Sequence, residues 1–185
     1  MKIVGIDLAG MDKNKTGFCA LTCSENKELD KVAKVKLMHT DAEILLAVEQ
    51  ENPDLICIDA PLSAPKEGDM RDCDHELVSY GKLPPLLGGM KSLTNRAIEL
   101  KRVLESYAII EIYAKATSKI LGYYDEDYVK QQKSLLSMGI RGDLEKRVLS
   151  KDEIDSVTAA LTGYLYLSGK TKEAGHDSII IIPGV

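Results

Sequence analysis

Asp7 and Asp59 each lie near the end of a short, strongly apolar segment of the sequence. An ionised carboxylate in such a place is costly to bury alone. If the two segments are adjacent strands of one sheet, the carboxylates lie side by side and repel each other unless a cation or a proton intervenes. Mg²⁺ or Mn²⁺, which prefer oxygen ligands, would remove that repulsion. Each residue could equally cap a turn, Asp7 before Gly10 and Asp59 before Pro61.

Asp155 is a third acid, and it has less of a structural explanation than its neighbours Asp152 and Glu153. Asp152 and Asp155 are three residues apart, so a helix carries both on one face. Asp152 and Glu153 suit the first helical turn, where the helix dipole and a capping box favour acids. Asp155 stands deeper in the helix, and the small residues that follow it would allow close packing on a sheet. Two strand acids and one helix acid are compatible with a metal site.

The periodicity of the sequence predicts the elements that must position these acids. Five segments have the apolar, β-branched character of strands, at 2–8, 16–22, 32–38, 55–60 and 108–113. Helical spacing marks 41–50, 93–107 and 150–167, with one or two further helices within 118–138. Short turns between the first three strands predict that these are antiparallel. We therefore expect one α/β domain over residues 1–185, with a mixed five-stranded sheet flanked by helices.

Two segments lie outside this regular pattern. Residues 61–91 are rich in Pro, Gly and charge, with a short helical stretch at 73–80, and are expected to form an excursion from the core. Long ordered loops of this kind are often functional. Residues 178–183 are expected to be either a late strand or a packed tail.

Composition limits the classes of function. With 44% hydrophobic residues the chain can bury one core, and it lacks a membrane-length apolar run and the pattern of a signal peptide. Four cysteines without a CxxC pair favour a reduced, cytoplasmic location. The net charge of −5 argues against a protein that coats nucleic acid, but not against a nuclease. Basic residues between 115 and 147 could form a phosphate-binding face or simply a solvated helix surface.

Several motifs together resemble a known family. They are VGIDLAG followed by TGFCAL, then ICIDAPLS, RDCDHEL, LTNRA, EIYAKATSKILG and KDEIDSVTAALTGYLYL. The set is similar to the domain-of-unknown-function family numbered 429, described as predicted nucleases of the ribonuclease H-like fold. The order of elements also resembles Holliday-junction resolvases of the RuvC type, in which acids on the first strand, the fourth strand and the last helix bind two metal ions.

The resemblance implies roles for individual residues. Asp7, Asp59 and Asp155 would be the metal ligands, with Asp152 as an additional or alternative one. The resolvases carry Glu where this chain has the shorter Asp59. Glu111 would be a supporting acid or a ligand, or else a strand residue paired with Lys or Arg.

The excursion carries a second implied group. Arg71 and Asp74, in the RDCDHEL motif, would contact substrate, or the charges of this loop would hold the loop together. His39, His75 and His176 have no metal-ligand or triad spacing and receive no role.

These features predict a metal-dependent nuclease that hydrolyses phosphodiester bonds with Mg²⁺ or Mn²⁺. Two ions would activate water and stabilise the leaving oxygen, with Asp7 bridging them. Nucleic acid, either DNA or RNA, is the expected partner; a homodimer is left open and no membrane association is expected. One alternative is a ribonuclease H-like module that binds without cutting. Another is an actin-like phosphotransferase, for which the chain has only half of the usual duplicated fold.

Overall fold

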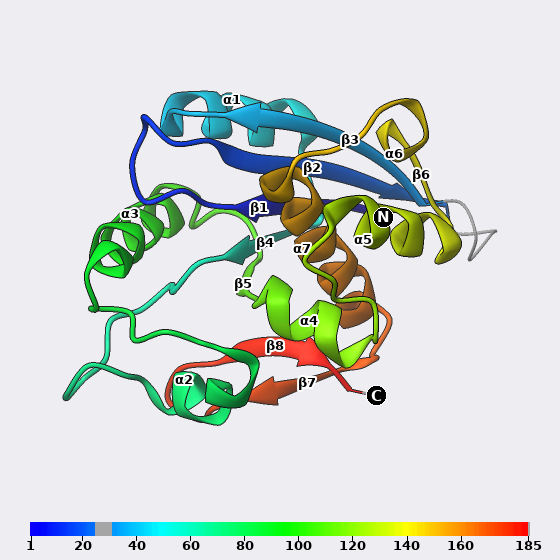
Figure 1. Ribbon diagram of the computed structural model, residues 1–185. Coiled ribbons are helices and arrows are strands. Elements are labelled where there is room, and N and C mark those ends of the chain that lie inside the picture. Colours follow the sequence, from blue (N-terminus) through cyan, green and yellow to red (C-terminus); the bar gives the residue numbers. More distant parts are fainter. Residues whose placement is uncertain (25–30, 185) are drawn as a thin grey trace.

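A six-stranded sheet forms the centre of the computed structural model, which describes residues 1–24 and 31–184 (Figure 1). Its strand order is β5-β4-β1-β2-β3-β6. The strands are β1 (Lys2–Asp7), β2 (Thr16–Cys23), β3 (Lys31–Met38), β4 (Leu55–Asp59), β5 (Ile109–Glu111) and β6 (Ile140–Gly142). The longer helices are α1 (Asp41–Glu51), α3 (Gly89–Val103), α5 (Tyr128–Ser137) and α7 (Lys151–Leu167). The shorter ones are α2 (Asp72–Glu76), η1 (Val78–Tyr80), α4 (Ala114–Ile120) and α6 (Asp143–Lys146).

The strand directions confirm the expected mixed sheet. β1 pairs antiparallel with β2, β2 pairs antiparallel with β3, and β4 lies parallel to β1 on its other side. β1 and β4 are therefore neighbours in the middle of the sheet, where helices cover both faces. This position explains why both strands are almost uniformly apolar until their last residue.

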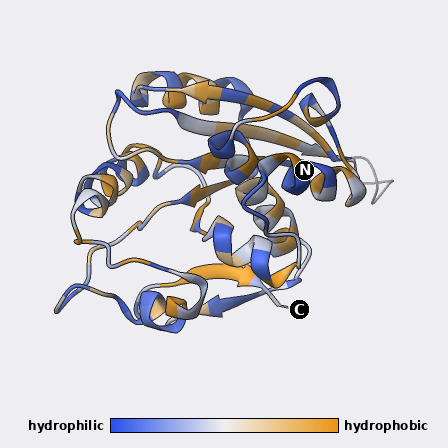
Figure 2. Cartoon of the chain, in the orientation of Figure 1, coloured by the Kyte–Doolittle hydropathy of each residue, from blue (hydrophilic) through white to orange (hydrophobic). Residues whose placement is uncertain are grey.

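Two parts of the sheet structure differ from the prediction. The main sheet has a sixth strand, because β6 pairs parallel with the edge strand β3. A separate two-stranded sheet joins β7 (Thr171–Ala174) and β8 (Ile180–Pro183) antiparallel, so the 178–183 segment is a strand. Figure 2 shows that β8 is hydrophobic, whereas β7 is mainly hydrophilic. The sequence did not predict β7 because it has no apolar pattern typical of a strand. β6 is only three residues long, too short for a periodic pattern.

Helix α7 packs closely on one face of the sheet because glycines line the contact. A Cβ atom on Gly5 of β1 would lie 2.2 Å from the carbonyl oxygen of Ser156. A Cβ atom on Gly17 of β2 would lie 1.9 Å from the carbonyl oxygen of Asp152. Only hydrogen fits at these positions, so the first two turns of α7 rest directly on β1 and β2. The N-cap is Ser150, which forms the predicted capping box with Glu153.

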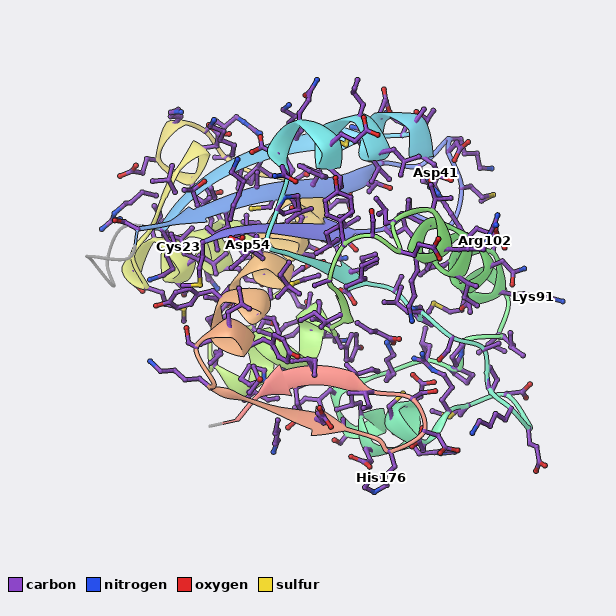
Figure 3. The ribbon with its side chains drawn as sticks, turned by 180° about the vertical axis from the view of Figure 1, so that it is seen from behind. Cys23, Asp41, Asp54, Lys91, Arg102 and His176 are labelled. Carbon is purple, nitrogen blue, oxygen red and sulfur yellow. The ribbon has the colours of Figure 1, made fainter. Side chains whose placement is uncertain are left out.

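Helices α1 and α3 cover the opposite face. Their buried residues pack with the alternate side chains of β1 and β4 in a second apolar cluster. Thr40 caps α1: its hydroxyl accepts from the Glu43 backbone N–H, and the Glu43 carboxylate accepts from the Thr40 backbone N–H. The Arg96 guanidinium of α3 donates to Asp41 at 2.8 Å, which fixes the two helices beside each other. Asp41 is labelled in Figure 3, viewed from behind.

The excursion at residues 61–91 packs against the β7–β8 hairpin. Its helix α2 begins at Asp72, whose carboxylate accepts from the backbone N–H groups of His176, Asp177 and Ser178. Figure 3 shows His176 at the turn of this hairpin, at the outer end of the molecule. Excursion and hairpin thus form one small layer below the main sheet (Figure 1). No helix in the part of the chain described here has the length and apolar character needed to cross a membrane.

Candidate active site

Asp7 and Asp59 are direct neighbours at the carboxyl ends of β1 and β4. The parallel register pairs Asp7 with Asp59, one strand spacing of about 4.8 Å apart in the sheet. Asp7 shares the face of β1 that carries Gly5, the face on which α7 packs, because side chains alternate along a strand. Asp59 accepts a hydrogen bond of 3.2 Å from the backbone N–H of Ala114, at the start of α4. Both carboxylates therefore point to the α7 side of the sheet.

Asp155 reaches the same place from α7. It lies on the second turn of the helix and lines a cavity together with Asp7 and Asp59. Its carboxylate also accepts a hydrogen bond of 2.7 Å from the ammonium group of Lys151, one turn earlier. The structure thus brings the three predicted acids to one cavity, from β1, β4 and α7, and adds one lysine to them.

The pKa values show that the three acids affect one another. Burial raises the pKa of Asp7 well above its usual value, and the nearby Asp59 and Asp155 carboxylates raise it further. Burial raises the pKa of Asp59 to about 7, although the ammonium group of Lys82 opposes the shift. The pKa of Asp155 is also raised by burial, against the effect of Lys151. In the absence of a further cation, these carboxylates resist ionisation.

The three carboxylates have the right chemistry to bind a hard divalent ion, but their side chains are not arranged as a metal site in this structure. Clustered carboxylates with raised pKa values are the oxygen ligands that Mg²⁺ and Mn²⁺ prefer. Across residues 1–24 and 31–184, however, no three acidic, His or Cys side chains are grouped so as to hold an ion as they stand. Asp155 is turned to Lys151. The Lys151 ammonium occupies one of its two carboxylate oxygens.

The cavity above the acids has a volume of about 650 Å³. Gly81 and Leu83 of the excursion contribute to its lining. Helix α4, the segment after it and the start of α5 contribute tyrosines 113, 124 and 128, the lysine at 115 and the acids at 125 and 126. The acids of the β1–β4 edge are therefore accessible to a ligand of moderate size.

Asp152 lies beside this group. It lines a separate shallow opening with Asp7 and with Lys13 and Lys15 of the β1–β2 turn. Its charge contributes to the raised pKa of Asp7. Asp152 is therefore near enough to act on Asp7, but it is absent from the lining of the main cavity that Asp155 shares.

Glu111, Arg71 and Asp74 form a different cluster. The Arg71 guanidinium donates to both Glu111 oxygens, at 2.6 and 2.7 Å, and to both Asp74 oxygens, at 2.8 Å. All three side chains are buried, with exposures of 4% or less. The sequence analysis allowed Glu111 to be a strand residue paired with Lys or Arg, and the structure shows this pairing, with Arg71. The structure thus holds these residues away from the three acids, tying the excursion to β5.

The basic residues of the second half do not form one continuous face. Lys130 pairs with Asp125, Lys146 with Asp143 and Arg147 with Glu153. Arg141 lies 3.9 Å from Glu145. The solvated-surface interpretation therefore applies to most of this stretch. Two of its lysines, 115 and 119, are near the cavity.

Sequence reasoning missed two cations that surround the acids. Lys151 precedes Asp155 by four residues, and this helical ion-pair spacing could have indicated the contact. Lys82 had no such signal. Its ammonium group is buried, 4.6 Å from the centroid of the Tyr113 ring and 3.9 Å from Glu111. Its positive charge acts on both the Arg71 cluster and Asp59. At Asp59 it partly offsets the rise in pKa that burial causes.

Comparison with known proteins identifies the fold. No family model matches the chain, and no curated protein does. Among solved structures, the chain is similar to the RuvC protein of T. thermophilus bound to a Holliday-junction substrate, with a TM-score of 0.55 and 12% identity over 91% of this chain and 96% of that one. A second structure, of RuvC from Thermus thermophilus, has a TM-score of 0.54 and 11% identity over 91% and 97%. The chain therefore has the ribonuclease H-like fold.

Proposed function

We propose that this protein is a metal-dependent nuclease that hydrolyses phosphodiester bonds. The observation that carries the proposal is the meeting of Asp7, Asp59 and Asp155, from two central strands and one helix, at the floor of an open cavity. The similarity of fold to RuvC, one structure of which contains a Holliday junction, supports nucleic acid as the substrate. At this level of identity the similarity extends to the fold alone, so the reaction is inferred from the acids.

The three carboxylates would hold Mg²⁺ or Mn²⁺. When bound, such ions lower the pKa of water and stabilise negative charge on phosphate oxygens. Asp7 pairs with Asp59 across the two strands, and the charges of both Asp59 and Asp155 act on it, so it would be shared between ligand positions. Asp152 would add negative charge on the far side of Asp7. The cluster of Glu111, Arg71 and Asp74 would hold the excursion wall of the cavity in place instead of contacting substrate.

A second candidate function is a nucleic-acid-binding module that does not cut. The specific observation in its favour is the ion pair between Lys151 and Asp155, which already neutralises one of the three acids without a metal. Under this alternative the acids and Lys151 are structural. The two candidates make opposite predictions about a divalent ion, because only the nuclease needs it.

The proposal is tested by cleavage of labelled single-stranded, duplex and branched nucleic acids with Mg²⁺ or Mn²⁺. Cleavage that requires the ion, stops with EDTA and is lost in Asp155→Asn supports it. Asp143→Asn is the matched control, because Asp143 is also a partly buried helix acid but lies outside the cavity. Binding of any of these substrates without cleavage under all conditions would favour the module.

A further inference from the structure

Two large side chains with apolar surface are exposed at the cavity that holds the three acids. Tyr124, after α4, is 41% exposed, and Leu83, in the excursion, is 53% exposed. Both line the 650 Å³ cavity above the three acids. They come from segments about forty positions apart in the sequence, and a flat apolar ligand would cover both. A purely ionic ligand would gain nothing from contact with these apolar surfaces.

Two lysines beside Tyr124 have no carboxylate partner among residues 1–24 and 31–184. The ammonium groups of Lys115 and Lys119 lie 5.8 and 5.3 Å from the centroid of the Tyr124 ring. Lys119 donates only to the carbonyl oxygen of Tyr80, at 3.4 Å. Within the described ranges, neither lysine makes an ion pair, although most other cations of this half of the chain do. Both charges are therefore available to an anion.

The acids of the rim limit where that anion can lie. Asp125 is neutralised by Lys130 at 3.1 Å, whereas Glu126 is exposed. A phosphate is therefore favoured on the α4 side, beside Lys115 and Lys119. The Tyr124 ring, with the two lysine ammonium groups over it, offers the two contacts that unpaired nucleotides need, namely an aromatic surface for the base and positive charge for the phosphate.

We infer that this cavity binds one unstacked nucleotide of a single-stranded nucleic acid, with its base on Tyr124 and a phosphate at Lys115 and Lys119. The inference rests on the proposed nuclease function and narrows its substrate. The volume suits one small organic ligand, and a base inside a duplex is stacked on both sides and cannot present its face to Tyr124. Single strands, or unpaired positions in a larger structure, thus reach the three acids more readily than continuous duplex.

Binding is measured by fluorescence anisotropy with a short labelled oligonucleotide as single-stranded DNA, single-stranded RNA or duplex DNA. EDTA is present throughout, so cleavage does not interfere. Wild type is expected to bind a single strand more tightly than duplex. Tyr124→Ala is expected to weaken this binding at least about fivefold, the low end for loss of one base stack, while Tyr124→Phe retains it. Tyr166→Ala is the matched control, because Tyr166 is 40% exposed and outside this cavity.

The lysines are tested separately by salt dependence. The double variant K115Q/K119Q is expected to reduce the slope of log affinity against log salt by about 0.7, as the loss of one phosphate contact to a single strand requires. The control K34Q/K36Q removes two exposed charges from β3 and should leave the slope unchanged. Equal binding by Tyr124→Ala and Tyr166→Ala, or tighter binding of duplex, would overturn the inference but leave the nuclease open. No binding of any nucleic acid by wild type would overturn both.

Discussion

At the scale of single residues, the most consequential feature is that the acids of the cavity are costly to ionise together. Asp59 illustrates it best, because its pKa is raised to about 7 by burial. The unfolded chain releases this proton near pH 4, so between pH 4 and 7 the folded state holds more protons than the unfolded state. Stability therefore falls as the pH rises through this window. Below pH 4 Asp59 is protonated in both the folded and the unfolded state, so it no longer changes the free energy of unfolding.

Asp59→Asn removes this cost, and the amide oxygen can still accept from the Ala114 N–H. In metal-free buffer the variant is expected to be more stable than wild type at pH 8 by about 1 to 2 kcal/mol, after discounting the shift for partial exposure. The difference is expected to disappear at pH 4. Urea unfolding at both values measures it. Asp69→Asn, at a fully exposed acid, is the control, and a gain at pH 4 as large as at pH 8 would contradict the explanation.

Lys151 also belongs to this scale, because its ammonium group pairs with Asp155, one of the three carboxylates that we propose as metal ligands. Lys151→Gln frees Asp155 and removes one repelling charge, so Mn²⁺ is expected to bind roughly three- to tenfold more tightly, the effect of one partly screened charge. Calorimetric titration compares it with wild type and with Lys146→Gln, whose ion pair with Asp143 is remote from the cavity. Weaker binding in Lys151→Gln would show that the lysine assists the ion instead of competing with it.

At the scale of elements, the contact between α7 and β1 places Asp155 over Asp7. Gly5→Ala inserts a methyl group 2.2 Å from the Ser156 carbonyl and 2.5 Å from the Ala160 nitrogen, so helix and strand must separate. The expected loss is about 1 to 3 kcal/mol or more, as for other overpacked interiors. Gly89→Ala, in α3, meets nothing within 4 Å and is expected to be neutral or stabilising. Thermal melts of the two variants compare the effects; equal melting temperatures would contradict the close contact.

The buried cluster around Arg71 joins the excursion to β5. Arg71→Met leaves Asp74 and Glu111 buried without their shared cation. Removing one partner of a buried ion pair typically lowers the free energy of unfolding by roughly 3 to 5 kcal/mol. Arg102→Met removes an exposed arginine paired with Glu99 and is expected to cost about 1 kcal/mol at most. Denaturant unfolding distinguishes the two. A small effect of Arg71→Met would mean that the excursion is held mainly by its apolar contacts.

The elements also show how far the sequence alone could lead. The strands that carry Asp7 and Asp59 are predictable from their short, strongly apolar runs, and the helix that carries Asp155 is predictable from its length and its helical spacing. β6 and β7 were missed because their pairing depends on distant partners, β3 and β8, and their own residues carry no periodic pattern. The same reason applies to Lys82 and Arg71, since their contacts arise only when the excursion folds back on β5. Glu111 was left open between two roles, and only its neighbour Arg71 distinguishes them.

At the scale of the whole molecule, the ribonuclease H-like sheet brings acids from three separate segments to one edge, and the excursion completes a cavity over them. The fold accounts for where the acids lie, whereas the chemistry that we propose for them requires a divalent ion at these carboxylates. The central claim therefore concerns what this assembly does to a phosphodiester bond. It is best tested at Asp7, whose pKa is raised by the charges of both other acids.

The most direct measurement follows cleavage and binding of one labelled nucleic acid by wild type and Asp7→Asn in the presence of Mn²⁺. Asn keeps the shape of the side chain but removes the charge needed to hold the ion. The variant is expected to fold, to bind the nucleic acid at least as well because phosphate repulsion falls, and to lose cleavage by orders of magnitude. Equal cleavage by the two proteins, or binding without cleavage by wild type, would contradict the nuclease.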